Sequence, residues 1–309
     1  MTYVLPPKAE GTISVAILDD LCYQYKYDYR NRMAEKKLPG KQWEFIVYDR
    51  LDRPVATGPA FSPFKDDASV GWMITKYDAF GRIIYTGWSS QAVSSTTRNT
   101  LQTAQNGAAL YETKDTSRTI DGIAAYYTNA NTPTSFKLLT VNYYDNYAFP
   151  GAQTPPSTVE GQAVLANIKG LVSGSWTRAL STPSSIAGET MTTFYDAKSR
   201  PVRTYQQNHL GGSTSIDSKL DFGGKTIYTI TKHKRTSGDP DLITREDFTY
   251  SAQDRLLSHT HQIGGVVQLL ASNTYDELGK LIIKNVGNTA GSPLQKIDYA
   301  YNIRGWLTE

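Results

Sequence analysis

Alternation of apolar and polar residues predicts β-strands along most of this chain. Residues 226–232 and 296–301 alternate clearly, and in residues 138–144 the side chains of Leu139 and Val141 fall on one face with Tyr143. A repeat of two places successive side chains on opposite sides of the backbone, which is the geometry of a strand. The pattern therefore favours strands with two different faces.

The strand patterns run into a turn motif. Residues 76–84 read Lys-Tyr-Asp-Ala-Phe-Gly-Arg-Ile-Ile. Asp78 and Gly81 stand at the first and fourth corners, the preferences of a type I turn whose last residue is left-handed. Apolar residues of high strand propensity follow at once. This stretch predicts a β-hairpin.

Seven copies of this frame occur in the chain. Tyr begins every copy, the second residue is Asp, Asn or Ser, the fifth is Gly, Asn or Asp except at Ser199, and the sixth is Arg or Lys except at Trp306. The predicted structural residues are Tyr27, Asp28, Arg32, Tyr48, Asp49, Arg53, Tyr77, Asp78, Gly81, Arg82, Tyr195, Asp196, Arg200, Tyr250, Arg255, Tyr275, Asp276, Gly279, Tyr301 and Gly305.

Each column of the frame has a physical reason. Short polar side chains bond the backbone of their own turn, and Gly, Asn and Asp tolerate a positive φ. We expect the Tyr and the basic residue to lie on opposite arms of one hairpin, where the guanidinium contacts the ring or reaches the Asp. Such an exposed contact contributes about 0.5 to 1 kcal/mol. The frame is then a staple within each hairpin.

The spacing of the copies predicts a repeat architecture. Most successive copies begin 21 to 29 residues apart, and a longer step contains a degenerate copy at residues 220–227. Repeats of this size are supersecondary units that cannot bury a face alone. Because an isolated hairpin is marginally stable, the hairpins must pair with one another. We expect an all-β fold of tandem antiparallel hairpins that form a long twisted ribbon.

The motif divides the chain into four parts. Residues 1–20 form a lead-in, 21–87 a first array of hairpins, 88–153 an insertion with a variant hairpin at Tyr144, and 154–309 a second array. Residues 13–21 are a strand or a short helix, and 97–109 are a candidate short helix. Residues 165–178 and 191–195 are predicted strands. Pro54 and Pro201 remove a ladder donor and predict a solvent-facing edge or a bulge.

Composition narrows the possible functions. Hydrophobic residues make up 39% and charged residues 20% of the 309, which favours a folded chain, and the 21 Tyr suit half-exposed strands. A net charge of +3, spread along the chain, gives no reason to expect nucleic acid as a partner. The lone Cys22 excludes an internal disulfide and leaves the redox compartment open.

We find no signal-peptide pattern and no apolar run long enough for a membrane span. The sequence stops directly after a complete frame, without a cap for its last strand. Open repeat ends are unstable, so we interpret the chain as a piece of a longer protein.

The frame resembles the YD repeat of the Rhs proteins. Residues 36–40, 141–145, 170–174 and 301–308 are similar to the version found in Bacteroidetes. The resemblance covers nearly the whole chain and implies a region just before the Rhs-associated core. It implies a curled shell that encloses or displays a C-terminal effector or toxin domain, in a secreted or cell-surface protein. The implied partner is the remainder of the same longer chain.

The alternative hypothesis is a cell-surface module that binds carbohydrate or protein. YD repeats as a family have been associated with carbohydrate binding, and insertions in repeat arrays often map to the binding face. Surface polysaccharide is the candidate ligand, with residues 88–153 as the candidate site. The frame tyrosines are already explained as hairpin staples, so we favour the scaffold.

Catalytic and metal-binding patterns are weak in this sequence. His259 and His261 would share one side of a strand, but the sequence places no third metal ligand beside them. Neighbouring acids at 19–20 and 66–67 do not aim at one substrate bond, and no nucleophile elbow or phosphate loop occurs. We therefore expect no enzymatic activity, no cofactor and no metal.

Overall fold

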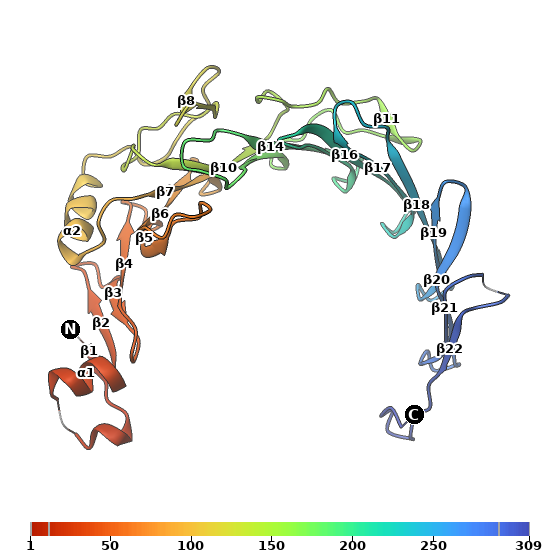
Figure 1. Cartoon of the computed structure of the whole chain (residues 1–309), viewed down its shortest axis with the longest axis horizontal. Helices are drawn as coiled ribbons and strands as arrows, with labels where there is room; N and C mark the ends of the chain where they lie inside the picture. The colour runs from red at the N-terminus through yellow and green to blue at the C-terminus, as the bar shows by residue number, and fades with distance from the viewer. Residues whose placement is uncertain (1, 12, 290, 309) are drawn as a thin grey trace. The chain divides into compact units, whose positions relative to one another are not determined.

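The computed structural model describes residues 2–11, 13–289 and 291–308, and these parts form an all-β protein of tandem antiparallel hairpins (Figure 1). Eighteen strands are assigned to extended antiparallel sheet, and four short strands form two separate ribbons. The predicted fold class is confirmed. Two compact units can be distinguished. The first holds the chain up to residue 143 with 148–151 and 175–189, and the second holds 144–147, 152–174 and the chain from 190 onward.

The first unit is a meander in which each strand pairs with the next, until β10 adds to the free side of β7. A short ribbon of β8 and β9 lies between β7 and β10 in the sequence. The strands are β1 (Thr2–Val4), β2 (Tyr23–Tyr27), β3 (Met33–Lys37), β4 (Trp43–Tyr48), β5 (Pro54–Phe61), β6 (Val70–Tyr77), β7 (Ile83–Ser89), β8 (Thr119–Ile120), β9 (Ile123–Ala124) and β10 (Lys137–Tyr144).

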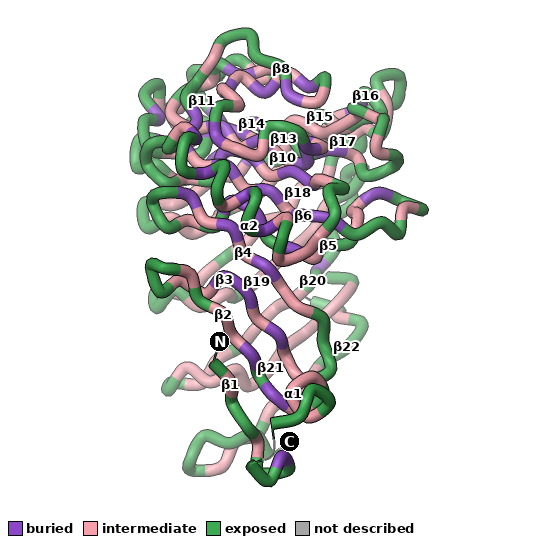
Figure 2. The backbone as a smooth tube through the Cα atoms, turned by 90° about the vertical axis from the view of Figure 1, so that its left-hand side faces the viewer, coloured by how far each residue is buried: buried purple, intermediate pink, exposed green. Residues whose placement is uncertain are grey.

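A dense apolar core fills the first unit. Trp72, Ile74, Tyr85 and Leu138 have no exposed surface, and the ring of Phe136 stacks on Tyr85 with 6.0 Å between centroids. The alternation predicted for residues 138–144 is confirmed, because Leu139, Val141 and Tyr143 are buried. Buried segments, purple in Figure 2, include parts of β4 and β6. Burial of this kind is the main stabilising contribution to folding.

The first unit also contains the helices. A 3-10 turn (Pro7–Ala9) precedes α1 (Val15–Leu21), which resolves the choice left open for residues 13–21 in favour of a helix. The predicted helix at 97–109 is α2 (Ser95–Ala104), which starts and ends earlier. The hydroxyl of Ser94 accepts a hydrogen bond from the Thr97 amide at 3.1 Å, so the helix begins at its cap.

The second unit is a meander of long hairpins with little core. Each strand from β14 to β22 pairs with the next. Among the described residues after 202, Leu269 is the one buried apolar side chain. Two strands, β13 (Val172–Arg178) and β14 (Gly188–Tyr195), have residues in both units. The strands that lie in the second unit alone are β11 (Thr158–Val159), β12 (Gln162–Ala163), β15 (Pro201–Gln207), β16 (Gly211–Leu220), β17 (Thr226–Thr236), β18 (Leu242–Tyr250), β19 (Leu256–Ile263), β20 (Val266–Tyr275), β21 (Leu281–Val286) and β22 (Gln295–Asp298).

Two local predictions have different outcomes. The strand predicted over 165–178 is wrong for residues 165–171, since the Asn167 side chain accepts from the Lys169 amide and Gly170 has φ 88°. At Pro54 and Pro201, where a solvent-facing edge or a bulge is predicted, the ladder register shifts beside both residues. The same shift occurs opposite Met33 and Ile83, so it belongs to the frame and not to proline. The four-part division of the chain stays a prediction.

Candidate functional site

The repeated frame forms the same turn at each copy. In the first copy the Asp28 amide donates to the Arg32 carbonyl at 2.9 Å, and the Asn31 amide donates to the Asp28 carbonyl at 3.0 Å. The Asp28 carboxylate accepts from the amides of Arg30 and Arg32. These bonds fold Asp, two loop residues and a left-handed fourth residue into a closed hairpin end. Equivalent backbone pairs close the turns that begin at Asp49, Asp78, Asp196, Asp221, Ser251, Asp276 and Asn302.

The fourth residue of the turn is left-handed in every copy. Its φ is 77° at Gly81 and 61° at Ser199, the residue that breaks the sequence column. A Cβ built on Gly81 would meet only the end of the Arg53 side chain, at 3.9 Å. Glycine is therefore favoured there by backbone conformation and not by crowding.

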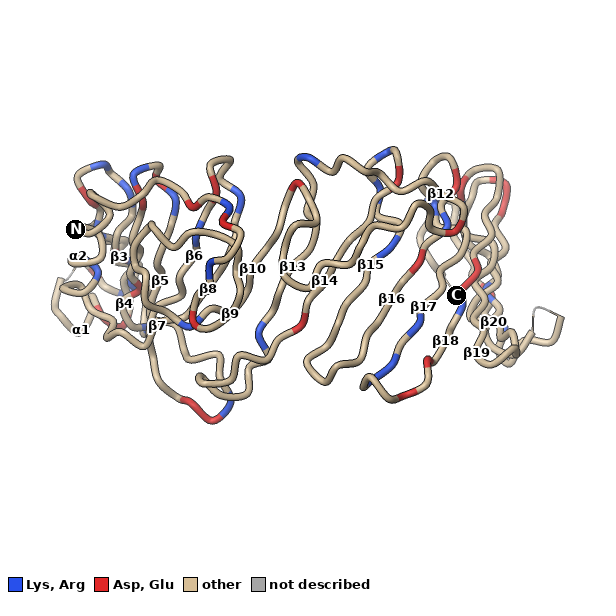
Figure 3. The backbone as a smooth tube through the Cα atoms, turned by 90° about the horizontal axis from the view of Figure 1, so that it is seen from above, with Lys and Arg blue, Asp and Glu red and all other residues tan. Residues whose placement is uncertain are grey.

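Acidic and basic residues lie beside one another at the turn tips (Figure 3) because the frame pairs them. Arg53 Nε reaches the carboxylate of Asp49 at 2.7 Å, and Arg200 reaches Asp196 at 2.6 Å. Burial acts to raise the pKa of Asp196, but hydrogen bonds from the Arg200 side chain and from backbone amides outweigh it, so the pKa lies below its usual value. The pKa of Asp28 is lowered in the same way by Arg32.

The aromatic contact of the basic residue differs from the expected staple. Arg32 lies over the ring of Tyr48 at 4.7 Å, and Arg53 lies over Tyr77 at 4.6 Å. Each guanidinium therefore binds the Asp of its own turn and the Tyr of the following copy. The same step links Lys225 to Tyr250, Arg255 to Tyr275 and Lys280 to Tyr301. The staple joins neighbouring hairpins.

The tyrosine hydroxyl completes this link. Tyr48 donates to the carbonyl of Met33 at 2.9 Å, and Met33 directly follows the basic residue of the previous copy. Tyr195 makes a similar bond to Val172 at 2.7 Å. The same placement recurs in the pairs Tyr77 to Pro54, Tyr250 to Thr226, Tyr275 to Leu256 and Tyr301 to Leu281. We call this ring, cation and carbonyl arrangement the interhairpin clasp.

The clasp lies where the backbone ladder between hairpins stops. The ladder between β3 and β4 ends at the pair Glu35 and Phe45, three residues before Tyr48. Strands β15 and β16 likewise stop at Arg203 and Asp217. Beyond these pairs, towards the frame turns, the ladder no longer joins the two strands. Tyr48 makes its clasp in this part of the first pair, and Leu220 holds the Tyr position in the second.

Where the ladder ends, backbone groups of the frame have no partner on the neighbouring strand. In the first unit the insertion supplies hydrogen-bond partners to these groups. The Gln102 side chain of α2 accepts from the Tyr48 amide at 3.0 Å and donates to the Tyr48 carbonyl at 2.8 Å. Arg98 donates to the carbonyl of Ile46. Further along, the Glu112 amide donates to the Tyr77 carbonyl at 2.9 Å. The insertion thus covers the ends of these hairpins that carry the frame turns.

The connector before β13 does the same in the second unit. Gln162, on the β11–β12 ribbon, accepts from the Leu220 amide at 3.0 Å and donates to the Ser218 carbonyl at 2.8 Å. The Leu165 amide donates to the Tyr195 carbonyl at 2.8 Å. A Gln from a helix and a Gln from a ribbon therefore both accept from the amide at the Tyr position of a frame, at Tyr48 and Leu220, but they donate to different carbonyls.

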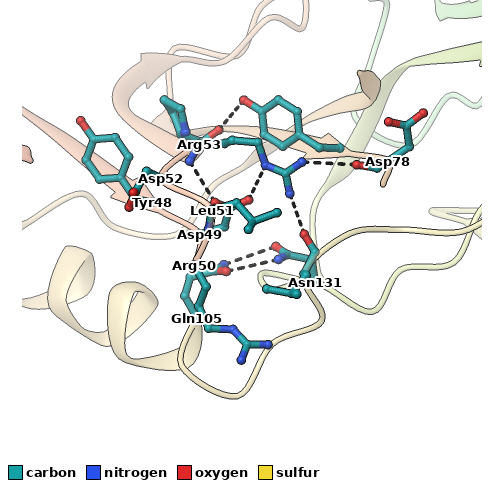
Figure 4. A network of polar contacts seen from close by, with 12 residues as sticks. Tyr48, Asp49, Arg50, Leu51, Asp52, Arg53, Asp78, Gln105 and Asn131 are labelled. Carbon is teal, nitrogen blue, oxygen red and sulfur yellow. Dashed lines mark hydrogen bonds and ion pairs between the residues drawn. The ribbon is translucent and has the colours of Figure 1, made fainter. Parts of the chain in front are cut away.

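A buried ion pair anchors the insertion in the first unit. Lys76 Nζ and the Glu112 carboxylate lie 3.6 Å apart and are almost fully buried. Burial lowers the pKa of Lys76 to about 8, against the opposing effect of Glu112. Glu112 also accepts from the amides of Ala130 and Asn131, and Gln105 pairs with the Asn131 side chain (Figure 4). This network fixes the loop to β6.

The remaining titratable candidates have structural surroundings. The His259 ring stacks on Phe248 at 4.4 Å, and the Asp67 carboxylate accepts from the Ser69 amide in a turn. Asp19 pairs with Lys37 at 2.5 Å. Within residues 2–11, 13–289 and 291–308, no three His, Cys, Asp or Glu side chains are grouped as metal ligands. In the same ranges no helix is long and apolar enough to cross a membrane.

Two features of the repeat were not predicted. Asn208 begins a turn of the same form at the other end of the hairpins, between β15 and β16. Its side chain accepts from the amides of Leu210 and Gly212. The Asn-x-x-Gly spacing was the signal. The covering role of Gln102 and Gln162 has no signal in the frame, because it depends on contacts across more than 50 residues.

Comparison with known proteins gives a distant fold likeness only. No family model and no curated protein matches the chain. One similar structure is a crystal structure of TcdB2-TccC3-TEV, at 10% identity and a TM-score of 0.29, covering 92% of this chain and 14% of that one. Another is a Tc holotoxin pore of Photorhabdus luminescens, at 12% identity and a TM-score of 0.25, covering 93% and 15%. The chain thus spans about a seventh of either.

Proposed function

We propose that this chain is a structural, non-enzymatic repeat region of a large Rhs-type protein, and that it forms part of a β-shell enclosing or displaying a C-terminal effector or toxin domain. The observation that carries this proposal is the interhairpin clasp. The Asp, Tyr and basic columns of the frame are engaged with one another and with neighbouring backbone, which is the arrangement a wall needs. Its partner is then the rest of a longer secreted or cell-surface protein.

The length of the array also supports a wall. Each clasp adds one hairpin to the one before it, so the sheet can be extended without a new core. The second unit has long strands and few buried apolar side chains, and many apolar residues on it are exposed, including Ile243, Val266 and Leu278. A surface of this kind is expected to be covered by other protein.

The carbohydrate- or protein-binding module centred on residues 88–153 has less support. Sugar sites present exposed rings, but Trp88, Tyr127, Phe136, Tyr143 and Phe149 of this segment are buried. Tyr111, at 40%, is the most exposed aromatic side chain of residues 88–153. The segment acts instead on the ends of the hairpins that carry the frame turns, through α2 and the loop that follows it.

Limited proteolysis with mass spectrometry tests the scaffold. The 309-residue chain is compared with the longer protein that contains it, under the same protease series. We expect cleavage of the isolated chain at the turns between residues 250 and 305, and resistance of the same turns in the longer protein. Uniform resistance of the isolated chain would contradict the wall and support a self-contained binding module. A glycan array, expected to be negative, gives the matching test of the alternative.

A further inference from the structure

A polar groove lies between two successive frame turns of the second unit, and we call it the 251/276 groove. Its volume is about 360 Å³. It is open where the ladder between β19 and β20 ends, at Ser258 and Ser272. The lining residues are Ser251, Gln253, Arg255, Leu257, Asn273, Thr274, Tyr275 and Asp276.

An equivalent groove exists earlier in the same unit, and another segment of this chain lines it and bonds to its backbone. It lies between the turns at Asp196 and Asp221, and its wall includes Gln162 and Ala163 of the β11–β12 ribbon. Both grooves are formed by one turn with its basic residue, Arg200 or Arg255, and by the start of the next turn. The two sites are therefore the same site in two repeats.

The bound segment shows what the site recognises. Gln162 accepts from the Leu220 amide at 3.0 Å and donates to the Ser218 carbonyl at 2.8 Å. Leu220 occupies the Tyr position of its frame, so Tyr275 and Asn273 hold the corresponding positions in the 251/276 groove. One side-chain amide satisfies both a donor and an acceptor there, as Gln102 does for Tyr48.

Asn273 gives independent evidence of a missing partner. Its amide nitrogen donates to the Leu256 carbonyl at 3.0 Å, whereas its side-chain oxygen is buried without a hydrogen-bond partner among the described residues. A buried acceptor without a donor destabilises the free protein. A ligand N–H that meets this oxygen after a rotation of the Asn273 side chain removes this cost.

We propose that the 251/276 groove binds an extended polypeptide segment that carries a Gln or Asn side chain, in the manner of the β11–β12 ribbon. The side-chain amide bridges the Tyr275 amide and the Asn273 carbonyl, and an N–H of the segment reaches the Asn273 side-chain oxygen once that side chain turns towards the groove. The groove exists whether or not the sheet forms part of a shell, so this binding does not depend on an enclosing role.

Fluorescence anisotropy with a labelled, end-capped peptide of residues 156–167 tests the site on the whole chain. We expect saturable binding at micromolar to submillimolar concentration. Replacing the peptide residue that corresponds to Gln162 with Ala is expected to weaken binding about tenfold, which corresponds to roughly 1.4 kcal/mol. This arm changes the probe and leaves the protein fold untouched.

Protein variants locate the binding. Asn273→Ala is expected to weaken binding at least fivefold, while Gln268→Ala, an exposed amide near the other end of β20, should leave it unchanged. Hydrogen exchange should slow at Tyr275 when peptide is added. Absence of saturable binding up to 1 mM, or equal binding by wild type and a folded Asn273→Ala variant, would overturn the site.

Discussion

At the scale of the residue, the tyrosine of the frame has two separate contacts with the preceding hairpin. Its ring receives the cation of the previous copy, and its hydroxyl reaches a carbonyl where the ladder has ended. Tyr is suited to this position because it combines an apolar ring with a polar tip. Six of the 21 Tyr residues make this bond, which Phe could not make.

Tyr48→Phe isolates the hydroxyl. The ring and its contact with Arg32 remain, but the Met33 carbonyl loses its donor, so the free energy of unfolding should fall by about 1 kcal/mol. Urea denaturation measures the change. Tyr29→Phe is the control, because that side chain is 86% exposed. An equal effect of the two substitutions would contradict the clasp.

The left-handed column makes a second prediction. Gly81→Ala should destabilise by about 1 to 2 kcal/mol, since a Cβ has room at this site but the φ of 77° is unfavourable. Ser199→Gly should have the opposite sign, because Ser199 already holds φ 61°. Thermal unfolding of both variants is the measurement. A stabilising effect of Gly81→Ala would exclude the conformational explanation.

The ion-paired carboxylates make the free energy of unfolding depend on pH. Because hydrogen bonds lower the pKa of Asp196 below its usual value of 3.8, its stabilising contribution is present above that value. It is lost as the pH falls through the lower pKa of the folded state. Asp196→Asn should therefore be less stable than wild type at pH 7, and the difference should shrink below pH 4. Urea midpoints from pH 7 to pH 2 measure this, with exposed Asp20→Asn as control.

The turns were predictable from residues alone, whereas the clasp was not. Asp, a left-handed fourth residue and a following strand are local requirements, and each appears in the sequence at its own position. The partner of the Arg is set by how consecutive hairpins pair, so Arg32 meets Tyr48 and not Tyr27. Both rings lie within reach in the sequence frame, and only the sheet decides between them.

At the scale of the element, the interruptions of the repeat supply hydrogen-bond partners to backbone groups near the frame turns. Helix α2 and the β11–β12 ribbon have different backbones, but both bring one Gln to the amide at the Tyr position of a frame, at Tyr48 and Leu220. A backbone group left without a partner by the ladder is thereby satisfied. The sequence predicts a helix at 97–109 and offers residues 88–153 as the binding site of the alternative hypothesis. The pairing of Gln102 with the Tyr48 backbone could not be predicted, because a side chain that pairs with distant backbone leaves no local pattern.

Gln162→Ala tests the covering role. Without the side chain, the Leu220 amide and the Ser218 carbonyl lose their partners, so hydrogen exchange at residues 218–221 should accelerate about tenfold. Exchange measured by mass spectrometry gives the rate. Gln268→Ala, exposed on β20, serves as the matched control. Unchanged exchange at Leu220 would show that the ribbon is not needed there.

At the scale of the whole molecule, the two compact units differ in how they are stabilised. The first has a packed core around Trp72 and Tyr85, and the second has long hairpins with half-exposed faces. Alternation in residues 226–232 correctly indicated a strand but gave no sign that neither face would be fully buried. What covers a face is a property of the surroundings and not of the strand.

This difference predicts unequal local stability. Strand amides in residues 226–286 should exchange at least ten times faster than those in residues 70–89, because few buried apolar contacts oppose local opening. Hydrogen exchange with mass spectrometry at pH 7 measures both regions in one sample. Equal protection would indicate that the ladder and clasps stabilise the second unit without a core.

The interhairpin clasp gives the array a direction of assembly. In each clasp the basic residue precedes, in the sequence, the Tyr whose ring it contacts. The carbonyl that accepts the Tyr hydroxyl also precedes that Tyr. During translation, when N-terminal segments fold first, every completed hairpin offers a finished docking site to the next one that emerges. The sheet then extends by one hairpin at a time on the hairpin already folded. A hairpin without its predecessor lacks the residues with which its Tyr forms the clasp.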